Sequence, residues 1–510
     1  MTIIKSATKL ATATVILALF GFVRDIVLAA MYGADVASDA FLLAYSIPVV
    51  LLAGIGYAVA DVLLPQYNRA EPSEKNLFFS NVINLVLIVA VGLSLLFMLI
   101  PRIPVLLFAS QVDTDVFDLT VSFLRITIWI AVPQMLISSL QIYLHAKGIF
   151  FLPRITTLCI PICIIVATIA SVAISNIYML PIGLLTGYTL YAATLIVMVV
   201  RQGFTYRPYI NVNDQKIKAM LPLILPLLLS MIGFELHHIV DKNFASTLAT
   251  GTITLMAFAF RISIQFNILI GASIALVMYP RLVQVANQGK HSMLAEYCKK
   301  YLQKLLPIVL PFTIGLFFLA EPIMYLLFER GAFTREDTQI ASAILRMYAI
   351  GIGFRSFNAF FTKIFVAVED TKTPARAYLL SLGIGIILNF ILIRPLQHIG
   401  LALSSSISAT VNTGLLIWAL RKRFGSLGLI SLKTEFIKTL VATIIMGIIV
   451  WLGSILLPVM GGGHLQAALL IFVLTIIGAC IYALMHAVLR TIFWNEGIQI
   501  TGSILNKLRK

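Results

Sequence analysis

The sequence predicts an all-α, polytopic membrane protein with 14 transmembrane helices. Hydrophobic residues make up 60% of the chain and charged residues only 11%, whereas roughly a quarter of the residues in a soluble domain are charged. Apolar segments of about 20 residues, the length that crosses a bilayer as a helix, recur along all 510 residues. No large soluble domain fits in the chain that remains.

Hydropathy and the distribution of basic residues together predict the topology. The expected helices span about 8–31, 36–62, 77–100, 117–144, 154–175, 178–200, 219–243, 252–280, 301–320, 339–367, 375–393, 398–420, 434–457 and 465–489. Connections rich in Lys and Arg alternate with connections that are acidic or poor in basic residues. The positive-inside rule then places both termini of a multi-pass protein of the inner membrane in the cytoplasm. An even number of helices follows, which supports 14.

The net charge of +16 and the four cysteines point to no other class of protein. The basic residues lie between apolar runs, without the aromatic-interleaved patch of a nucleic-acid-binding surface, so we expect no nucleic acid partner. The cysteines form no C-x-x-C pair, and we expect neither a disulfide nor a bound metal.

An internal similarity predicts two six-helix lobes related as a parallel repeat. An offset of 215 maps Ala44–Ile47 onto Ala259–Ile262 and carries Gly56, Ala60 and Pro65 onto Gly271, Ala275 and Pro280. The predicted units are an N-lobe at 1–205, a C-lobe at 206–425, and 426–510 with two further helices and a basic cytoplasmic tail. Secondary transporters built from such repeats bind substrate between the halves. Coincidence among apolar helices is the alternative.

Charges inside the predicted spans are the first candidate site. Arg24 and Asp25 lie in the span 8–31, Asp39 in 36–62 and Arg261 in 252–280, where a charge at the bilayer centre costs at least about 2.5–3.5 kcal/mol. Arg24 is seven and Arg261 nine residues from the outer end of its span, so we expect both at a similar depth of roughly 10–14 Å. We predict that all four bind substrate, that Arg24 pairs with Asp39, and that Asp25 points away from Arg24. Snorkelling of the arginines to the outer head groups is the alternative.

Further polar residues suggest a coupling site and a cavity lining. The span 219–243 carries Asp241, which with Asn389 is a candidate site for a coupling cation; a hydrogen-bonded cluster near the outer surface, which also includes Glu235, His237, His238 and Lys242, is the alternative. A second offset of 221 maps Ala146 and Pro153 onto Ala367 and Pro374. At this offset Arg355 occupies the repeat position of Gln134 and is a candidate cavity residue.

No motif of an enzyme or of a nucleotide-driven pump is found in the sequence. We therefore expect a carrier without catalysis, driven by an ion gradient, the membrane potential or the gradient of its substrate. A small-molecule cation antiporter is a rival interpretation, but such an exporter needs an acidic cavity, whereas Arg24 and Arg261 predict a basic one.

Several short motifs resemble a known family. G-F-V-R-D at 21–25, A-S-D-A-F at 37–41, Y-P-R-L at 279–282 and D-T-K-T-P at 370–374 are similar to the MurJ/MviN family of lipid II flippases, within the multidrug/oligosaccharidyl-lipid/polysaccharide exporter superfamily. The similarity runs from the first to about the twelfth predicted helix.

The resemblance implies alternating access and movement of an undecaprenyl-diphosphate-linked saccharide, most simply lipid II, from the inner to the outer leaflet. Arg24, Asp39 and Arg261 match cavity residues of that family, and a sodium ion near Asp241 is implied as the coupling ion. The family tends to carry arginines where this chain has Ala18 and Leu52, so an exopolysaccharide or O-antigen repeat-unit flippase is the alternative. Expected partners are the lipid-linked glycan, membrane lipids and cell-wall synthesis proteins, for a monomeric carrier.

Overall fold

The computed structural model is helical in the residues that it describes. These are 2–69, 71, 73–268, 282, 284, 291–368, 370–425, 432–456, 463–492 and 494, with side chains described outside 2–11, 53, 226, 229–238 and 291–295. None of the described residues forms a strand, and eleven of their helices are long and apolar enough to cross a membrane. The prediction of an all-α polytopic membrane protein is confirmed at this level.

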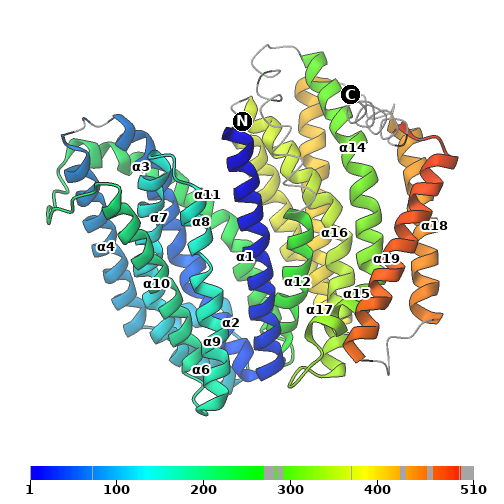
Figure 1. The fold of residues 1–510 in the computed structure, drawn as a ribbon, viewed down its shortest axis with the longest axis horizontal. Coiled ribbons are helices and arrows are strands. Elements are labelled where there is room, and N and C mark those ends of the chain that lie inside the picture. Colours follow the sequence, from blue (N-terminus) through cyan, green and yellow to red (C-terminus); the bar gives the residue numbers. More distant parts are fainter. Residues whose placement is uncertain are drawn as a thin grey trace. The chain divides into compact units, whose positions relative to one another are not determined.

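One compact unit comprises the chain up to Thr254 together with residues 330–334. In Figure 1 its helices run from blue to green. They are α1 (Thr2–Tyr32), α2 (Val36–Pro48), the π-helical η1 (Val49–Ala53), α3 (Gly54–Arg69), α4 (Lys75–Leu99), α5 (Arg102–Phe108), α6 (Thr114–Thr127), the 3-10 helix η2 (Ile128–Ile130), α7 (Ala131–Ala146), α8 (Phe151–Thr156), α9 (Cys159–Ala173), α10 (Met179–Arg201), α11 (Gln215–Ala245) and the first residues of α12 (Thr252–Asn267).

The core of this unit is built by helices that pack in pairs, with α1 against α8 and α9, α2 against α6, α3 against α7, and α9 against α10. At one end of the α3, α4 and α7 group, four aromatic rings lie with centroids 5.1–5.8 Å apart: Tyr67, Phe79, Tyr143 and Phe204. Offset and edge-to-face ring pairs at this separation stabilise a fold beyond the burial of their area.

The second compact unit comprises residues 255–329 and 335–510. Besides the rest of α12 it contains α14 (His291–Phe318), α15 (Ala320–Phe328), α16 (Arg335–Ala367), α17 (Lys372–Phe424), α18 (Lys433–Leu456) and α19 (Gly463–Val488). α16 packs against α14, α15 and α17, and α18 packs against α14 and α19. A buried cluster on α14, α16 and α17 includes Tyr301, Phe360, Phe361 and Leu416.

α17 is two helices joined by a break. Gln397 has φ 48° and ψ −128°, far from helical values, and Pro395 lies two residues before it. The second half begins close to the first, because a Cβ added to Gly400 would overlap the carbonyl oxygen of Leu392. The expected helices 375–393 and 398–420 match these two halves.

The predicted repeat and its lobes at 1–205, 206–425 and 426–510 stay predictions. The compact units follow packing and do not report a repeat, and α11 packs against α3 and α5 within the first unit. The repeat partners Gly271, Ala275 and Pro280, and most of the Y-P-R-L motif, lie outside the described residues.

Small residues bring α9 and α10 into close contact. A Cβ added to Gly187 would lie 2.9 Å from the Cα of Ile160 and 3.2 Å from the carbonyl oxygen of Cys159, and one added to Gly183 would overlap Ala167. Helices in lipid associate through such close backbone approach, since apolar burial alone does not favour helix contact there.

We therefore expect Gly187→Ala to lower the thermal unfolding midpoint in detergent micelles, because the added methyl group meets backbone atoms that cannot move aside. The cost is about 1–3 kcal/mol. Gly92→Ala is the matched control, since Gly92 lies within α4 with no atom near its Cβ position, and alanine gains helix propensity there. An unchanged midpoint for Gly187→Ala would show that α9 and α10 are not closely packed.

Candidate functional site

Arg24 and Asp25 form a buried ion pair on α1. Arg24 Nη2 and Nε lie 2.6 Å and 2.9 Å from the same carboxylate oxygen, Asp25 Oδ1. Arg24 is 7% and Asp25 2% exposed. The hydroxyls of Tyr45 and Tyr188 lie 3.5 Å apart, and both are close enough to the Arg24 guanidinium to interact with it electrostatically. A charged pair with two hydrogen bonds is the arrangement that allows an arginine to stay inside the apolar span.

The predicted partners of Arg24 and Asp39 are wrong. Neighbouring side chains on a helix diverge by about 100°, but the long arginine side chain folds back and reaches the adjacent carboxylate. Asp39 instead binds residues 212 and 215 positions away. Asp25 accordingly does not point away from Arg24. The assignment of Arg24, Asp25, Asp39 and Arg261 to substrate binding stays a prediction.

Asp39 accepts three hydrogen bonds at the beginning of α12. Gly251 N donates to Oδ2 at 2.7 Å, while Thr254 N and Thr254 Oγ1 donate to Oδ1 at 2.8 Å and 2.6 Å. The first N–H groups of a helix lack intrahelical partners and carry partial positive charge, so a carboxylate there satisfies them and is stabilised in return. Asp39 is 2% exposed and thus caps α12 from α2.

Three turns close around this cap, and we call them the glycine clasp: the turn at 33–35 between α1 and α2, the turn at 249–252 before α12, and residues 330–334. Ala332 N donates to the carbonyl oxygen of Ala30 at 2.8 Å. Gly251 (φ 90°) and Gly331 (φ 60°) adopt left-handed conformations, and an added Cβ would overlap the carbonyl oxygens of Ala34 and Ala30. Glycine is required there for both backbone angle and space.

Arg261 and Arg355 lie in the second unit. Arg261 is partly buried on α12, nine residues after the helix begins at Thr252. Arg355 on α16 donates from Nη2 to Ser405 Oγ at 2.8 Å, and its guanidinium lies 5.7 Å and 5.8 Å from the ring centroids of Phe260 and Tyr348. These contacts hold Arg355 between α12, α16 and α17. Its role as a cavity residue stays a prediction.

The residues predicted to bind a coupling cation fall in different units. Asp241, partly buried near the end of α11, is in the first, and Asn389, 2% exposed on α17, is in the second. The side-chain oxygen of Asn389 accepts a hydrogen bond from Ser404 Oγ. The side chains of Glu235, His237 and His238 lie outside the described ones. The cation site stays a prediction.

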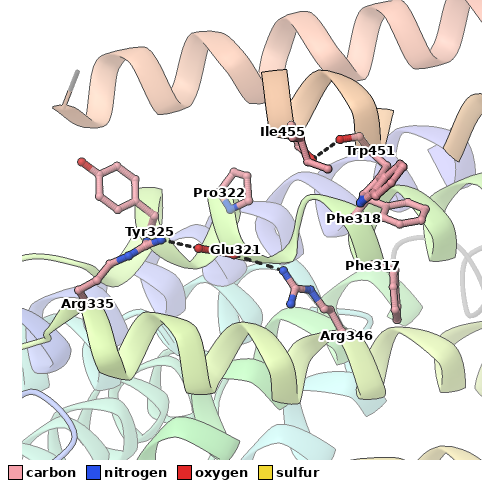
Figure 2. A pocket seen from close by; sticks show the side chains of 10 residues that line it. Phe317, Phe318, Glu321, Pro322, Tyr325, Arg335, Arg346, Trp451 and Ile455 are labelled. Atoms are coloured by element: carbon pink, nitrogen blue, oxygen red, sulfur yellow. Dashed lines mark hydrogen bonds and ion pairs between the residues drawn. The ribbon is translucent and has the colours of Figure 1, made fainter. Parts of the chain in front are cut away.

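A further charged network lines a pocket of about 440 Å³ in the second unit. Figure 2 shows Glu321 on α15 between Arg335 and Arg346 of α16, binding one with each carboxylate oxygen. Arg335 also contacts Glu329 at 3.3 Å. Phe318 and Trp451 lie at the other end of the pocket, so aromatic and ion-paired residues share its wall.

Comparison with known proteins decides the family. The family model described as lipid II flippase MurJ matches residues 28–474. The chain belongs to the MurJ lipid II flippase family. Relatives named probable lipid II flippase MurJ include those of Rickettsia prowazekii, 28% identical over 82% of this chain and 83% of the relative, and Thermotoga maritima, 27% identical over 80% and 83%.

Solved structures show the MurJ fold. A lipid II flippase MurJ in an inward closed conformation superimposes with a TM-score of 0.82 at 24% identity, over 96% of this chain and 99% of that one. A multidrug resistance transporter of the MATE family in an inward-facing conformation has a TM-score of 0.66 at 13% identity, over 80% and 94%. At these identities the likeness establishes the fold of this MurJ family member.

The sequence reasoning did not identify the glycine clasp or Glu321. Each clasp turn has a glycine between apolar runs, in M-Y-G-A-D at 31–35, A-T-G-T at 249–252 and E-R-G-A-F at 329–333. That spacing indicates three turns but not that they meet. Glu321 lies in a short stretch between expected spans, and its distance of 25 residues from Arg346 gives no sequence signal that the two side chains meet.

We expect Asp39→Asn to open the glycine clasp locally. The amide nitrogen of asparagine cannot accept from Gly251 N, and hydrogen bonds to a charged group contribute about 1.5–3 kcal/mol. Hydrogen exchange of the Gly251 and Thr254 amides should therefore accelerate about tenfold or more. Asp61→Asn, at an exposed position on α3, is the control and should leave exchange at 249–254 unchanged. Unaltered protection in Asp39→Asn would exclude the capping role.

Proposed function

We propose that this MurJ family member moves lipid II, an undecaprenyl-diphosphate-linked saccharide, from the inner to the outer leaflet of the cytoplasmic membrane by alternating access. The single observation that carries the proposal is the family match over residues 28–474, which spans Asp39 and Arg261. The named relatives support it, because each carries the lipid II flippase name over four fifths of the chain or more.

The chemistry of Arg24 fits a diphosphate. Asp25 accepts from Nε and from one N–H of Nη2, which leaves the second N–H of Nη2 and both N–H groups of Nη1 for phosphate oxygens. A guanidinium stays charged at every physiological pH and binds phosphate through two parallel hydrogen bonds. Arg24 and Arg261 together supply two such groups on helices α1 and α12. A substrate anion would take over part of the charge balance that Asp25 now provides.

We infer the finer architecture from the same family. Fourteen spans, two six-helix lobes with the substrate between them, and cytoplasmic termini agree with the basic connections, and each expected span overlaps a helix of the described chain. A monomeric carrier without catalysis, in contact with cell-wall synthesis proteins and membrane lipids, fits the movement of a peptidoglycan precursor.

The alternative substrate, an exopolysaccharide or O-antigen repeat unit, rests on Ala18 and Leu52. Leu52 is 2% exposed, so an arginine there would need space that this chain does not provide. The likeness to MATE transporters at 13% identity concerns the fold alone and lends no support to drug transport. Rescue of a strain lacking its lipid II flippase, beside rescue of a strain lacking an exopolysaccharide flippase, separates the two glycan substrates.

We predict that Arg24→Ala and Arg261→Ala each abolish rescue of the lipid II flippase-deficient strain while the protein still inserts in the membrane. Arg24→Lys should rescue partially, because an ammonium replaces the bidentate fork. Arg125→Ala is the matched control, since Arg125 is an exposed arginine on α6, and it should rescue fully. Full growth with both the Arg24 and Arg261 alanine variants would exclude their binding role.

We further predict that transport depends on sodium through Asp241. One elementary charge crossing 100 mV is worth about 2.3 kcal/mol, enough to bias a two-state carrier. Asp241→Asn should weaken the sodium dependence of cysteine labelling at cavity positions without altering substrate binding, and Asp214→Asn, at the start of α11, serves as the control. Labelling that ignores both sodium replacement and an ionophore would leave the substrate gradient as the driver.

A further inference from the structure

A second pocket, of about 500 Å³, lies where α16 ends and where the two ends of α17 meet. We call it the α16–α17 pocket. Its charged and polar lining residues are Asp370, Thr373, Arg376, Lys422 and Arg423, and its apolar lining includes Phe365, Leu380, Leu415 and Trp418. All of these residues belong to the second compact unit and are separate from Arg24, Arg261 and the glycine clasp.

Asp370, the carboxylate among the described lining residues, is already engaged. Asp370 accepts hydrogen bonds from Thr373 N at 3.0 Å and Thr373 Oγ1 at 2.8 Å, and Arg423 Nη1 lies 2.6 Å from its Oδ2. Burial acts to raise the pKa of Asp370, but the Thr373 hydrogen bonds and the Arg423 guanidinium outweigh it and hold that pKa below its ordinary value. Asp370 therefore stays ionised, and its bonds fix Arg423 at the pocket.

Two cations of the pocket have no carboxylate partner within the described part of the chain. Among the described residues, none gives Arg376 or Lys422 an ion pair, and Lys422 Nζ lies over the ring of Trp418, 5.4 Å from its centroid. Three cations and one carboxylate give the described part of the lining a net positive charge. Basic pockets between transmembrane helices at a membrane surface are the usual binding places of anionic lipid head groups.

The pocket is also layered along the two halves of α17, with its cations at the helix ends and apolar residues further in. Arg376, Lys422 and Arg423 lie within about four residues of an end of α17. Leu380 and Trp418 lie one turn further in, roughly 6 Å deeper than Arg376 and Lys422. Leu380 is 60% and Trp418 63% exposed. Exposed apolar residues at that depth of a transmembrane helix face lipid, and tryptophan favours the interface between head groups and chains.

We propose that the α16–α17 pocket binds an anionic phospholipid of the surrounding bilayer as a resident, untransported ligand. Its phosphate accepts hydrogen bonds from Arg376 and Lys422 beside the fixed Arg423, and its glycerol and first acyl carbons lie against Leu380 and Trp418. A zwitterionic phospholipid would bring the cation of its own head group to described lining residues that already carry a net positive charge. The assignment requires only that the chain spans a membrane, so it stands or falls separately from lipid II transport.

The test uses the fluorescence of Trp418 in full-length protein. The chain has four tryptophans, and a Trp129→Phe, Trp451→Phe, Trp494→Phe background leaves only the one in the pocket. The protein is placed in phosphatidylcholine nanodiscs that contain a minor fraction of either phosphatidylglycerol or phosphatidylcholine brominated near the top of the acyl chain. We expect brominated phosphatidylglycerol to quench Trp418 at much lower mole fraction than brominated phosphatidylcholine.

A charge-matched pair of variants separates a built site from general surface charge. Arg376→Ala with Lys422→Ala should lower the preference for phosphatidylglycerol by about tenfold or more, since each basic residue near an anionic surface contributes about fivefold. Arg421→Ala with Lys433→Ala removes two exposed cations that do not line the pocket and should leave the preference unchanged. Equal loss in both double variants, or equal quenching by the two lipids, would overturn the proposal.

Two competitors identify the source of the phosphate. Inorganic phosphate at constant ionic strength should not relieve quenching, because it cannot occupy the apolar part of the pocket; relief would assign the pocket to a free anion. Undecaprenyl diphosphate should displace brominated phosphatidylglycerol from the pocket only in proportion to its mole fraction in the bilayer. Selective displacement by that lipid would assign the pocket to the transported substrate and would also overturn a resident phospholipid.

Discussion

A carboxylate inside a membrane-spanning helix needs hydrogen-bond donors from the protein itself, and this constraint at Asp39 organises the first unit. Water is not available in the hydrocarbon region, so each polar group must find a partner internally. Asp39 finds three donors at the start of α12. The turns around it must then approach closely, which is possible only because Gly251 and Gly331 carry no Cβ. The glycine clasp is thus the backbone consequence of one buried charge.

The same constraint recurs in the second unit with different solutions. Arg355 is held by a serine hydroxyl and two aromatic faces, Glu321 by two arginines, and Asn389 by a serine. These groups are balanced within the protein at a cost in desolvation. A buried ion pair can exchange one of its two partners for a ligand of the same charge. An unpaired ion has no partner to exchange, and it would not remain buried.

The sequence predicted the helices well because a bilayer reduces the problem to segment length and hydropathy. Even the division of α17 near residue 397 was expected, since hydropathy separates the spans 375–393 and 398–420 there. The partners of Asp39 could not be predicted, because two of its three donors are backbone N–H groups, which every residue but proline carries, at positions more than 200 residues away. The prediction that Asp25 points away from Arg24 was wrong because it used only the angle between neighbouring Cα–Cβ bonds on a helix. The arginine side chain is long enough to fold back onto the adjacent carboxylate.

The short motifs predicted the MurJ family, and the match over residues 28–474 confirms it. The motifs gave the right family because they consist of residue types in a fixed order, which a sequence states directly. Side-chain partners depend on the fold, which a sequence does not state. The coupling site and the lobes depend on which distant segments lie close together in space. The positions of Asp241 and Arg261 in the sequence do not reveal this.

The placement of Arg24 and Asp25 on adjacent positions of one helix has an electrical consequence. When α1 tilts or shifts as a rigid body, the guanidinium and the carboxylate travel together, and their displacement through the transmembrane field carries no net gating charge. The field then does almost no work on the unliganded pair. If an anionic ligand binds beside the pair, the same movement carries the charge of that ligand, so this part of α1 responds to voltage only when the carrier is loaded.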